Sequence, residues 1–222
     1  MSAPDLTAAA VRLLLDRGYD ATTADDLADA AGMSRSTFFR RFGSKDDIVF
    51  ADHEALLERV ADYFQDSTSD PVHAVSVATR MVLDHHLARP GAARERYALL
   101  QAHPPLRDRE LIITRRYERV YRRYLERVAP GRSPAWLPLA FAAGIVSVHN
   151  DILRQWLHDP GFPATERLDL VMSELTALYR PLLSADGRTS TRVIVATFET
   201  GAEPRDVMQA VRETVGSAGS AE

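Results

Sequence analysis

The amino-acid sequence predicts an all-α fold, with a small N-terminal helical domain followed by a larger helical domain. Apolar side chains recur every three or four residues over most of the 222 positions, which is the period of an amphipathic helix. Proline and glycine punctuate these stretches at the places where one helix would end and the next would begin. One stretch near the C-terminus departs from this pattern.

Three short helices and the start of a long fourth helix account for the first 50 residues. Glycines at 18, 32 and 43 can each end a helix. Hydroxyl side chains that can cap the next helix follow at Thr22 or Thr23, at Ser34 and at Ser44. Ser44 and Asp47 have the spacing of a capping box. The expected helices span residues 6–17, about 23–31, 35–42 and about 44–66.

Five longer helices are expected in the second part of the chain. They are separated by pairs that contain proline or glycine: Asp70-Pro71, Pro90-Gly91, Pro104-Pro105, Pro130-Gly131 and Asp159-Pro160. The expected helices lie near residues 70–88, 91–101, 106–129, 134–158 and 165–183.

The stretch that departs from the helical pattern is "RVIVATFE", residues 192–199. It is dense in β-branched and aromatic residues, which is typical of a strand, and Pro204 can open a short helix to about residue 215. A lone strand leaves backbone groups unpaired. We therefore expect this strand to pair, for example with its copy in a second subunit, or else to be helical.

The composition excludes several kinds of site. Cysteine is absent, which excludes disulfides, thiolate zinc sites and thiol nucleophiles. The formal net charge of -4 argues against non-specific binding of nucleic acid by the whole surface. The N-terminus lacks a basic leader, and no apolar run reaches the roughly 18–20 residues of a membrane span. We expect a soluble cytoplasmic protein.

Residues 32–45 differ in charge from the rest of the chain, with four basic residues and no acidic one. Just before and within them, Ala28 and Gly32 stand four apart, where a helix-turn-helix needs a small residue and a turn-forming one. Leu27, Met33 and Phe38 can then face inward as a small core. The pattern predicts a DNA-binding helix-turn-helix, although short arginine-bearing helices also occur as ordinary surface.

The helix at 35–42 would read the DNA. Its first residues, Arg35 and Ser36, lie where such helices meet base edges, and arginine can donate two hydrogen bonds to guanine. Arg41 and Lys45 are better suited to phosphates, which set position and carry no sequence information. Helix N-termini add backbone N–H donors. The candidate DNA contacts are Thr22, Thr23, Ser34, Arg35, Ser36, Thr37, Phe39, Arg40, Arg41 and Lys45.

The same residues carry a family resemblance. The pattern Ala28-x-x-x-Gly32-Met33-Ser34-x-x-x-Phe38-Phe39-x-x-Phe42-x-Ser44-Lys45 resembles the N-terminal domain of the TetR family of transcriptional regulators, over residues 5 to about 52. The resemblance implies a recognition helix at 34–41 and a two-domain, all-helical homodimer. It implies a helix-turn-helix domain at 1–50, a ligand-binding and dimerisation domain at 51–184, and an extension at 185–222 outside the usual core.

Two positions depart from the family pattern. The family usually has tyrosine where Phe39 stands, with its hydroxyl on a phosphate, so Phe39 would make an apolar contact instead. The family often has histidine or tyrosine where Arg41 stands, and Arg41 could restore the lost phosphate contact. The departures affect single contacts and leave the domain assignment intact.

The resemblance also implies that the last two large helices form the dimer interface. Small residues at three-to-four spacing on the first of them would let two helices approach closely, and Trp156 could anchor the interface or belong to the core. Ordinary packing within the chain is the alternative. The candidate interface residues are Ala140, Ala143, Gly144, Ser147 and Trp156.

The remaining helices should enclose a pocket for a small, mostly hydrophobic effector. Tyr117 and Tyr121 are four apart and share a helix face. Each polar candidate could equally make an ordinary structural hydrogen bond. The candidate pocket residues are Arg80, His85, Tyr97, Tyr117, Tyr121, His149 and Asn150.

We find no sequence pattern of an enzyme or a metal site, and we expect no cofactor. His85 and His86 are adjacent and so diverge on a helix, and no glycine-rich phosphate loop or nucleophile elbow occurs. We expect a homodimeric repressor released from a palindromic operator by its effector. The alternatives are a binding or interaction module that no longer grips DNA, and an activator or a regulator without effector.

Overall fold

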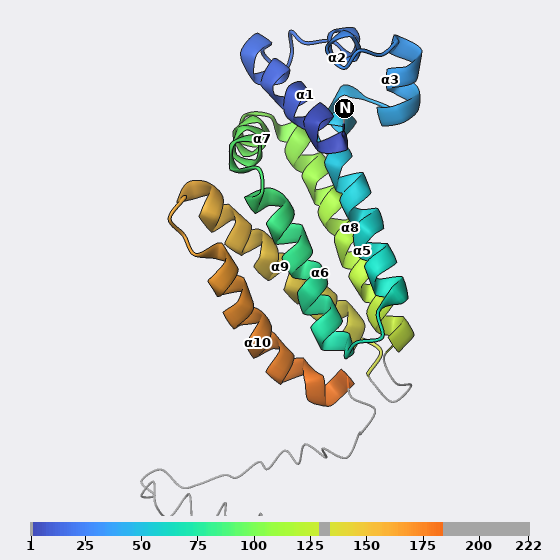
Figure 1. Ribbon diagram of the computed structural model, residues 1–222, viewed down its shortest axis with the longest axis vertical. Coiled ribbons are helices and arrows are strands. Elements are labelled where there is room, and N and C mark those ends of the chain that lie inside the picture. The colour runs from blue at the N-terminus through green and yellow to red at the C-terminus, as the bar shows by residue number, and fades with distance from the viewer. Residues whose placement is uncertain (1, 129–133, 184–222) are drawn as a thin grey trace, which may run out of the picture. The chain divides into compact units, whose positions relative to one another are not determined.

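The computed structural model describes residues 2–128 and 134–183, and within these ranges the secondary structure is helical, with no strand (Figure 1). The all-α prediction is therefore confirmed. The expected strand at 192–199 and helix at 204–215 lie outside the described residues. The helices are α1 Ala3–Arg17, α2 Ala24–Ala30, α3 Arg35–Phe42, α4 Lys45–Ile48, α5 Ala51–Asp66, α6 Pro71–Leu87, α7 Pro90–Ala102, α8 Pro104–Val128, α9 Leu137–His158 and α10 Ala164–Leu183.

The N-terminal helices form what we call the reading head (residues 2–50). Helices α2, α3 and α4 begin at the expected hydroxyl caps, and α1 begins at Ala3, three residues earlier than expected. Thr23 accepts a hydrogen bond from the backbone N–H of Asp26 and completes a capping box, and Ser34 accepts one from Thr37. These caps satisfy N–H groups that have no partner within their helix. The turn between α2 and α3 depends on Gly32, whose φ of 66° is a conformation that favours glycine.

The predicted helix at 44–66 is wrong in one respect, because it is two helices. Ile48, Val49 and Phe50 are all buried, with exposed fractions of 0%, 0% and 3%. All three side chains belong to the same hydrophobic core as Leu56 and Leu57 of α5. The chain breaks between α4 and α5, where Phe50 has φ -118° and ψ 13°, and all three side chains reach the interior.

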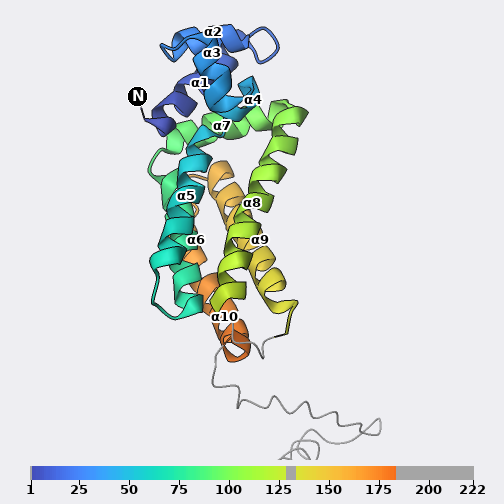
Figure 2. The ribbon, with the colours of Figure 1, turned by 90° about the vertical axis from the view of Figure 1, so that its right-hand side faces the viewer.

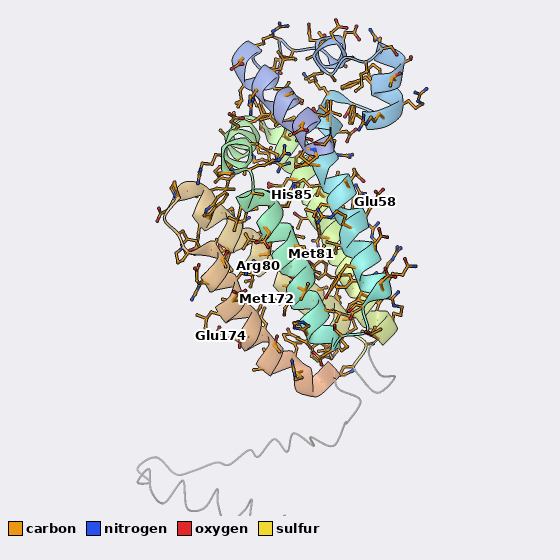
Figure 3. The ribbon with its side chains drawn as sticks, in the orientation of Figure 1. Glu58, Arg80, Met81, His85, Met172 and Glu174 are labelled. Atoms are coloured by element: carbon orange, nitrogen blue, oxygen red, sulfur yellow. The ribbon has the colours of Figure 1, made fainter. Side chains whose placement is uncertain are left out.

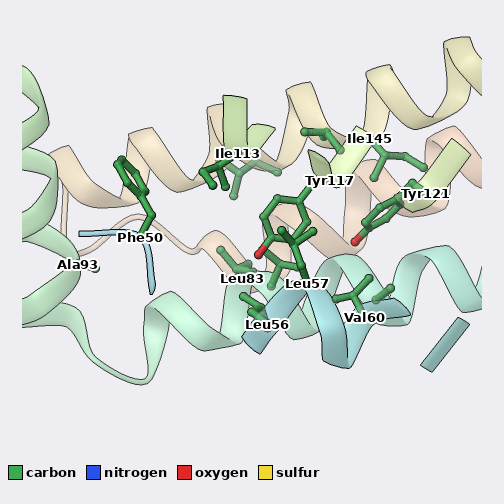
Figure 4. Close-up of a cluster of buried hydrophobic side chains, with 14 of the residues drawn as sticks. Phe50, Leu56, Leu57, Val60, Leu83, Ala93, Ile113, Tyr117, Tyr121 and Ile145 are labelled. Atoms are coloured by element: carbon green, nitrogen blue, oxygen red, sulfur yellow. The ribbon is translucent and has the colours of Figure 1, made fainter. Parts of the chain in front are cut away.

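The body of the protein consists of α5 to α10. Helices α5, α6, α8, α9 and α10 run along its length, and α7 lies across them below the reading head (Figure 2). Figure 4 shows the core between α5, α6, α8 and α9, where Tyr117 and Tyr121 lie among Leu57, Val60 and Leu83. In the residues that the structure describes, no helix is both long and apolar enough to cross a membrane.

Helix α1 belongs by its packing to both the reading head and the body. It packs against α5 and α7 as well as α2. The Thr7 hydroxyl is buried and donates a hydrogen bond to the backbone carbonyl of Ile48 over 3.1 Å. At the surface, Arg12 pairs with Glu95 on α7 at 3.3 Å. The reading head is thereby joined to the body through α1 and through the α4–α5 junction.

Candidate functional site

Helix α3 presents polar and basic side chains to solvent along one side and apolar side chains inward. Phe38 is fully buried, with an exposed fraction of 0%, and packs edge-on against Phe39, with 5.7 Å between the ring centroids. Phe39 is 39% exposed. Phe42 is half-buried at 5.2 Å from Phe38. The rings of Phe38 and Phe42 thus fix α3 in place, and Phe39 is the phenylalanine that faces outward.

The exposed face of α3 carries the candidate DNA contacts. Ser34, Arg35, Ser36, Arg40 and Arg41 are all exposed, and Thr37 is half-buried. Nη1 of Arg35 lies 2.6 Å from Oδ2 of Asp25 on α2, and its guanidinium lies over the Phe39 ring at 5.5 Å from the centroid. Arg35 is therefore held beside Phe39 at the start of the helix, where a major groove would be met.

Thr22 and Lys45 are placed differently from the other candidates. Thr22 is buried, with an exposed fraction of 1%, and its hydroxyl donates to the backbone carbonyl of Gly18 over 2.8 Å. Thr23 is the exposed residue that caps α2. The ammonium of Lys45 donates to the carbonyl of Tyr19 over 2.9 Å and lies 4.0 Å from the centroid of the Tyr19 ring. Lys45 thus joins α4 to the turn after α1.

A cavity of about 80 Å³ lies inside the body between α5, α6, α7, α8 and α9. Its lining is mainly apolar, with a group of tyrosine and histidine side chains. It includes five of the seven predicted pocket residues: Tyr97, Tyr117, Tyr121, His149 and Asn150.

Arg80 and His85 were expected to line this cavity and do not; Figure 3 labels both on α6. Arg80 makes surface ion pairs with Asp84 at 2.8 Å and with Asp169 at 3.1 Å. His85 lies 2.8 Å from the carboxylate of Asp52. Both residues lie on a helix, as predicted. Their side chains point away from the cavity because they pair with carboxylates on α5, α6 and α10.

The sequence analysis missed several polar residues that line the cavity, among them His53, His86 and Arg96. Arg96 is buried and donates to the carboxylate of Asp52 over 2.7 Å and to the carbonyl of Val49 over 3.4 Å. Nothing in the local sequence marks Arg96, because its partners lie 44 and 47 residues away. The one sequence signal for His86 was its position next to His85, which was a predicted pocket residue.

The buried position of these groups shifts their pKa values. Burial lowers the pKa of His53 to about 3, with further lowering by the nearby Arg96 charge. Burial also lowers the pKa of His86. Burial acts against ionisation of Asp52, but the Arg96 guanidinium and the hydrogen bond with His85 outweigh it and hold the pKa of Asp52 well below its usual range. At neutral pH His53 and His86 are uncharged, and Asp52 and Arg96 are an ion pair.

A second, smaller cavity lies beside the first, between α1 and the body. It is lined by Pro4, Thr7, Ala8 and Val11 of α1, and by Asp52, His85, His86, Arg89, Ala92, Ala93 and Arg96. Arg96 and His86 line both cavities. The Asp52–Arg96 pair therefore lies between the 80 Å³ cavity and α1, the helix that joins the reading head to the body.

The outward faces of α9 and α10 carry the candidate interface. Ala140, Ala143 and Gly144 are half-buried and Ser147 is exposed, and a side chain added at Gly144 would meet open space. Trp156 is 7% exposed and lies 4.8 Å from the Arg94 guanidinium, so it belongs to the core. On the same two helices Leu139, Leu170 and Leu178 are 55%, 50% and 64% exposed.

Among the described residues, no group of three or more histidine or acidic side chains is arranged to hold a metal ion. His53 and His86 are close, with 5.4 Å between ring centroids, but His149 lies 6.4 Å from His86.

A helix-turn-helix with an exposed basic helix, joined to a helical body that contains a cavity, is the arrangement of a DNA-binding regulator. Residues 6–51 match the family model described as "Bacterial regulatory proteins, tetR family". The resemblance to the TetR family of transcriptional regulators is thereby confirmed, and the N-terminal domain of the chain is of that family.

Relatives align over most of the chain. It is 29% identical over 158 residues to the DNA-binding transcriptional repressor TetR of Mycobacteroides abscessus, covering 69% of this chain and 74% of that protein. It is 25% identical over 164 residues to MftR of Mycobacterium tuberculosis, which is named for regulation of mycofactocin biosynthesis, covering 72% and 81%.

Solved structures share the fold. A SmeT–triclosan complex superposes with a TM-score of 0.60 at 14% identity, covering 92% of this chain and 100% of that one. The regulator FadR of Bacillus subtilis in complex with stearoyl-CoA superposes with a TM-score of 0.52 at 15% identity, covering 77% and 95%.

Proposed function

We propose that this protein is a homodimeric repressor that binds a roughly palindromic operator through α3 and is released by a small, mostly hydrophobic effector. In this proposal residues 1–50 bind DNA, and residues 51–184 bind the effector and dimerise. The observation that carries the proposal is the joining of an exposed basic α3 to a body with its own internal cavity.

DNA binding is assigned to the exposed side of α3 and its flanks. Arg35 is the candidate for base recognition, because it lies at the exposed start of the helix and only a surface carboxylate, Asp25, engages it. Arg40 and Arg41 are the candidates for phosphate contacts. Thr22 is buried, so it would contribute to DNA binding only through its backbone. The Lys45 ammonium is already hydrogen-bonded to Tyr19, so Lys45 would contribute by fixing the position of α4.

Dimerisation is assigned to α9 and α10. Leucines exposed on both helices, with small residues beside them on α9, form the kind of apolar surface that a second copy can cover. Two reading heads in such a dimer would meet successive major-groove faces about 34–36 Å apart, or a multiple of that distance.

The effector is assigned to the 80 Å³ cavity, whose lining is mainly apolar. SmeT in its complex with triclosan and FadR with stearoyl-CoA have the same fold, and both of those molecules carry large apolar parts. Coupling between effector and DNA in such proteins is typically about 1–3 kcal/mol and reciprocal.

The test is a fluorescence-anisotropy titration of the DNA upstream of the protein's own gene, against a scrambled duplex of equal length. We expect Arg35→Ala to reduce the preference for the upstream DNA, and Arg41→Ala to weaken binding to both duplexes and lower the salt dependence. Arg59→Ala, on α5 and outside the reading head, is the control and should change neither. Equal binding of both duplexes by the unmodified protein would favour the alternative, a module that no longer reads DNA.

A further inference from the structure

The 80 Å³ cavity contains a hydrogen-bond acceptor that no group in the described part of the protein satisfies. His149 lines the cavity from α9, and its side chain is buried with an exposed fraction of 6%. Its Nε2 is buried and has no hydrogen-bond partner among the described residues. A buried polar atom without a partner is costly, and most such atoms in proteins are satisfied by protein, water or ligand.

The other ring nitrogen fixes the chemical character of Nε2. Nδ1 of His149 lies 3.1 Å from Oδ1 of Asn150, the next residue along α9. An amide oxygen can only accept a hydrogen bond, so Nδ1 carries the proton and donates it. Burial lowers the pKa of His149, which keeps the ring neutral. In the neutral ring with a protonated Nδ1, Nε2 is an acceptor and needs a donor.

The charges of the lining disfavour a charged ligand. The guanidinium of Arg96 is already paired with the Asp52 carboxylate at 2.7 Å, so it is not an open counter-ion for an acid. Glu110 also lines the cavity, with an exposed side chain, and would repel an anion. A cation would be buried near Arg96. Burying a charge without a partner is far more costly than burying a hydroxyl that is hydrogen-bonded.

We propose that the effector is an uncharged, mainly apolar molecule that carries a hydroxyl group, and that this hydroxyl donates its hydrogen bond to Nε2 of His149. The inference rests on the proposed function, because it names the chemical class of ligand for the same cavity. The remaining lining, including Val82, Ile113 and Ile145, holds the apolar part. A hydroxyl group would supply the hydrogen-bond donor that Nε2 of His149 needs. A hydrocarbon of the same shape would leave Nε2 unsatisfied.

Three fluorinated probes of similar size test this class of ligand: 4-fluorophenol, 4-fluorotoluene and 4-fluorobenzoate. Their dissociation constants are measured by fluorine NMR titration of the full-length protein at pH 7.5. Two variants separate the acceptor from the volume of the ring. His149→Phe removes the acceptor and keeps a ring, and His149→Gln places an amide oxygen near the position of Nε2. Thermal denaturation of each variant shows that it is folded.

We expect the phenol to bind the unmodified protein, and the benzoate to bind more weakly than the phenol. The ratio of phenol affinity to toluene affinity should fall roughly two- to tenfold in His149→Phe, the range of one neutral hydrogen bond, and should be largely kept in His149→Gln. An unchanged ratio in His149→Phe, tighter binding of the benzoate, or no binding of the phenol near its solubility limit overturns the inference.

The outcome is separate from that of the DNA titration. A protein that reads its upstream DNA but shows no phenol preference keeps the proposed function and loses this inference. A protein that shows the preference but does not distinguish the two duplexes keeps the ligand chemistry and loses the assignment as a DNA-reading regulator.

Discussion

Arg96 on α7 donates a hydrogen bond to the carboxylate of Asp52 on α5 over 2.7 Å, and both residues are buried. The pair lines the space between the 80 Å³ cavity and α1, and Arg96 also reaches the carbonyl of Val49 at the α4–α5 junction. It thus connects the body to the segment that leads into the reading head.

The buried pair should be sensitive to loss of one partner. Asp52→Asn keeps the size of the side chain and leaves the Arg96 charge without a counter-ion, so we expect unfolding to become easier by about 3–5 kcal/mol. Glu95→Gln is the matched control, since Glu95 precedes Arg96 and makes an exposed pair with Arg12. Its cost should stay below about 1 kcal/mol. Urea denaturation measures both, and equal costs would mean that the buried pair adds no stability beyond a surface pair.

Stability should fall as the pH falls below about 6.5. The pKa of His53 is about 3 in the folded protein, mainly because of burial, and rises to its ordinary value on unfolding. Between these values the unfolded chain binds a proton that the folded chain does not, so acid favours unfolding. Each such histidine contributes a slope of about 1.4 kcal/mol per pH unit.

Two variants isolate the contribution of His53. In urea denaturation between pH 7.5 and 4.5, His53→Phe should show a shallower loss of stability than the unmodified protein, whatever its absolute stability. His73→Asn, at an exposed position, should keep the original slope. The groups around His53 include Asp52, Arg96 and His85, and identical slopes in all three proteins would assign the acid sensitivity to them.

The ion pair between Arg35 and Asp25 should compete with DNA. Asp25→Asn releases Arg35, and an exposed pair of this kind is worth little in stability. We expect specific DNA to bind roughly two- to fivefold more tightly at low salt, which corresponds to the worth of one surface pair. The control is Asp29→Asn, which removes an equal charge at another exposed position of α2. A similar gain in both variants would show that charge alone, and not the release of Arg35, tightens binding.

The assignment of the dimer interface to α9 and α10 can be tested with two leucines of nearly equal exposure. Leu178 on α10 is 64% exposed, and Leu111 on α8 is 63% exposed. A glutamate buried in an apolar interface loses its hydration, so Leu178→Glu should shift the dimer to monomer. Leu111→Glu should leave the mass unchanged. Light scattering after size exclusion measures both, and an intact dimer in Leu178→Glu would place the interface elsewhere.

The reading head could be predicted from the sequence because local features specify it. Thr23 and Ser34 cap their helices through hydrogen bonds to residues three positions on, and Gly32 provides the turn between α2 and α3. Each of these interactions spans only a few residues. The spacing of apolar residues likewise placed α6 to α10 within a few residues of their ends.

Features that depend on distant parts of the chain were not predictable in this way. The break after Ile48 brings Val49 and Phe50 into the core that α1, α5 and α8 build, and helical spacing alone gave no sign of it. Arg96 has the sequence context of a surface residue, yet packing places it against Asp52, 44 residues earlier. His85 was assigned to the 80 Å³ cavity because no local pattern shows that the same carboxylate engages it.

The double packing of α1 has a consequence for engineered hybrids. A regulator made by exchanging residues 1–50 with those of a relative would bring a foreign α1 onto this α7. Thr7 and Val11 would be replaced at the wall they share with Ala93 and Arg96, while Glu95 would lose Arg12 as its partner. A hybrid that is to keep its response to the original effector therefore needs the α1 side chains that face α7 to be those of this chain, even where the rest of residues 1–50 is exchanged.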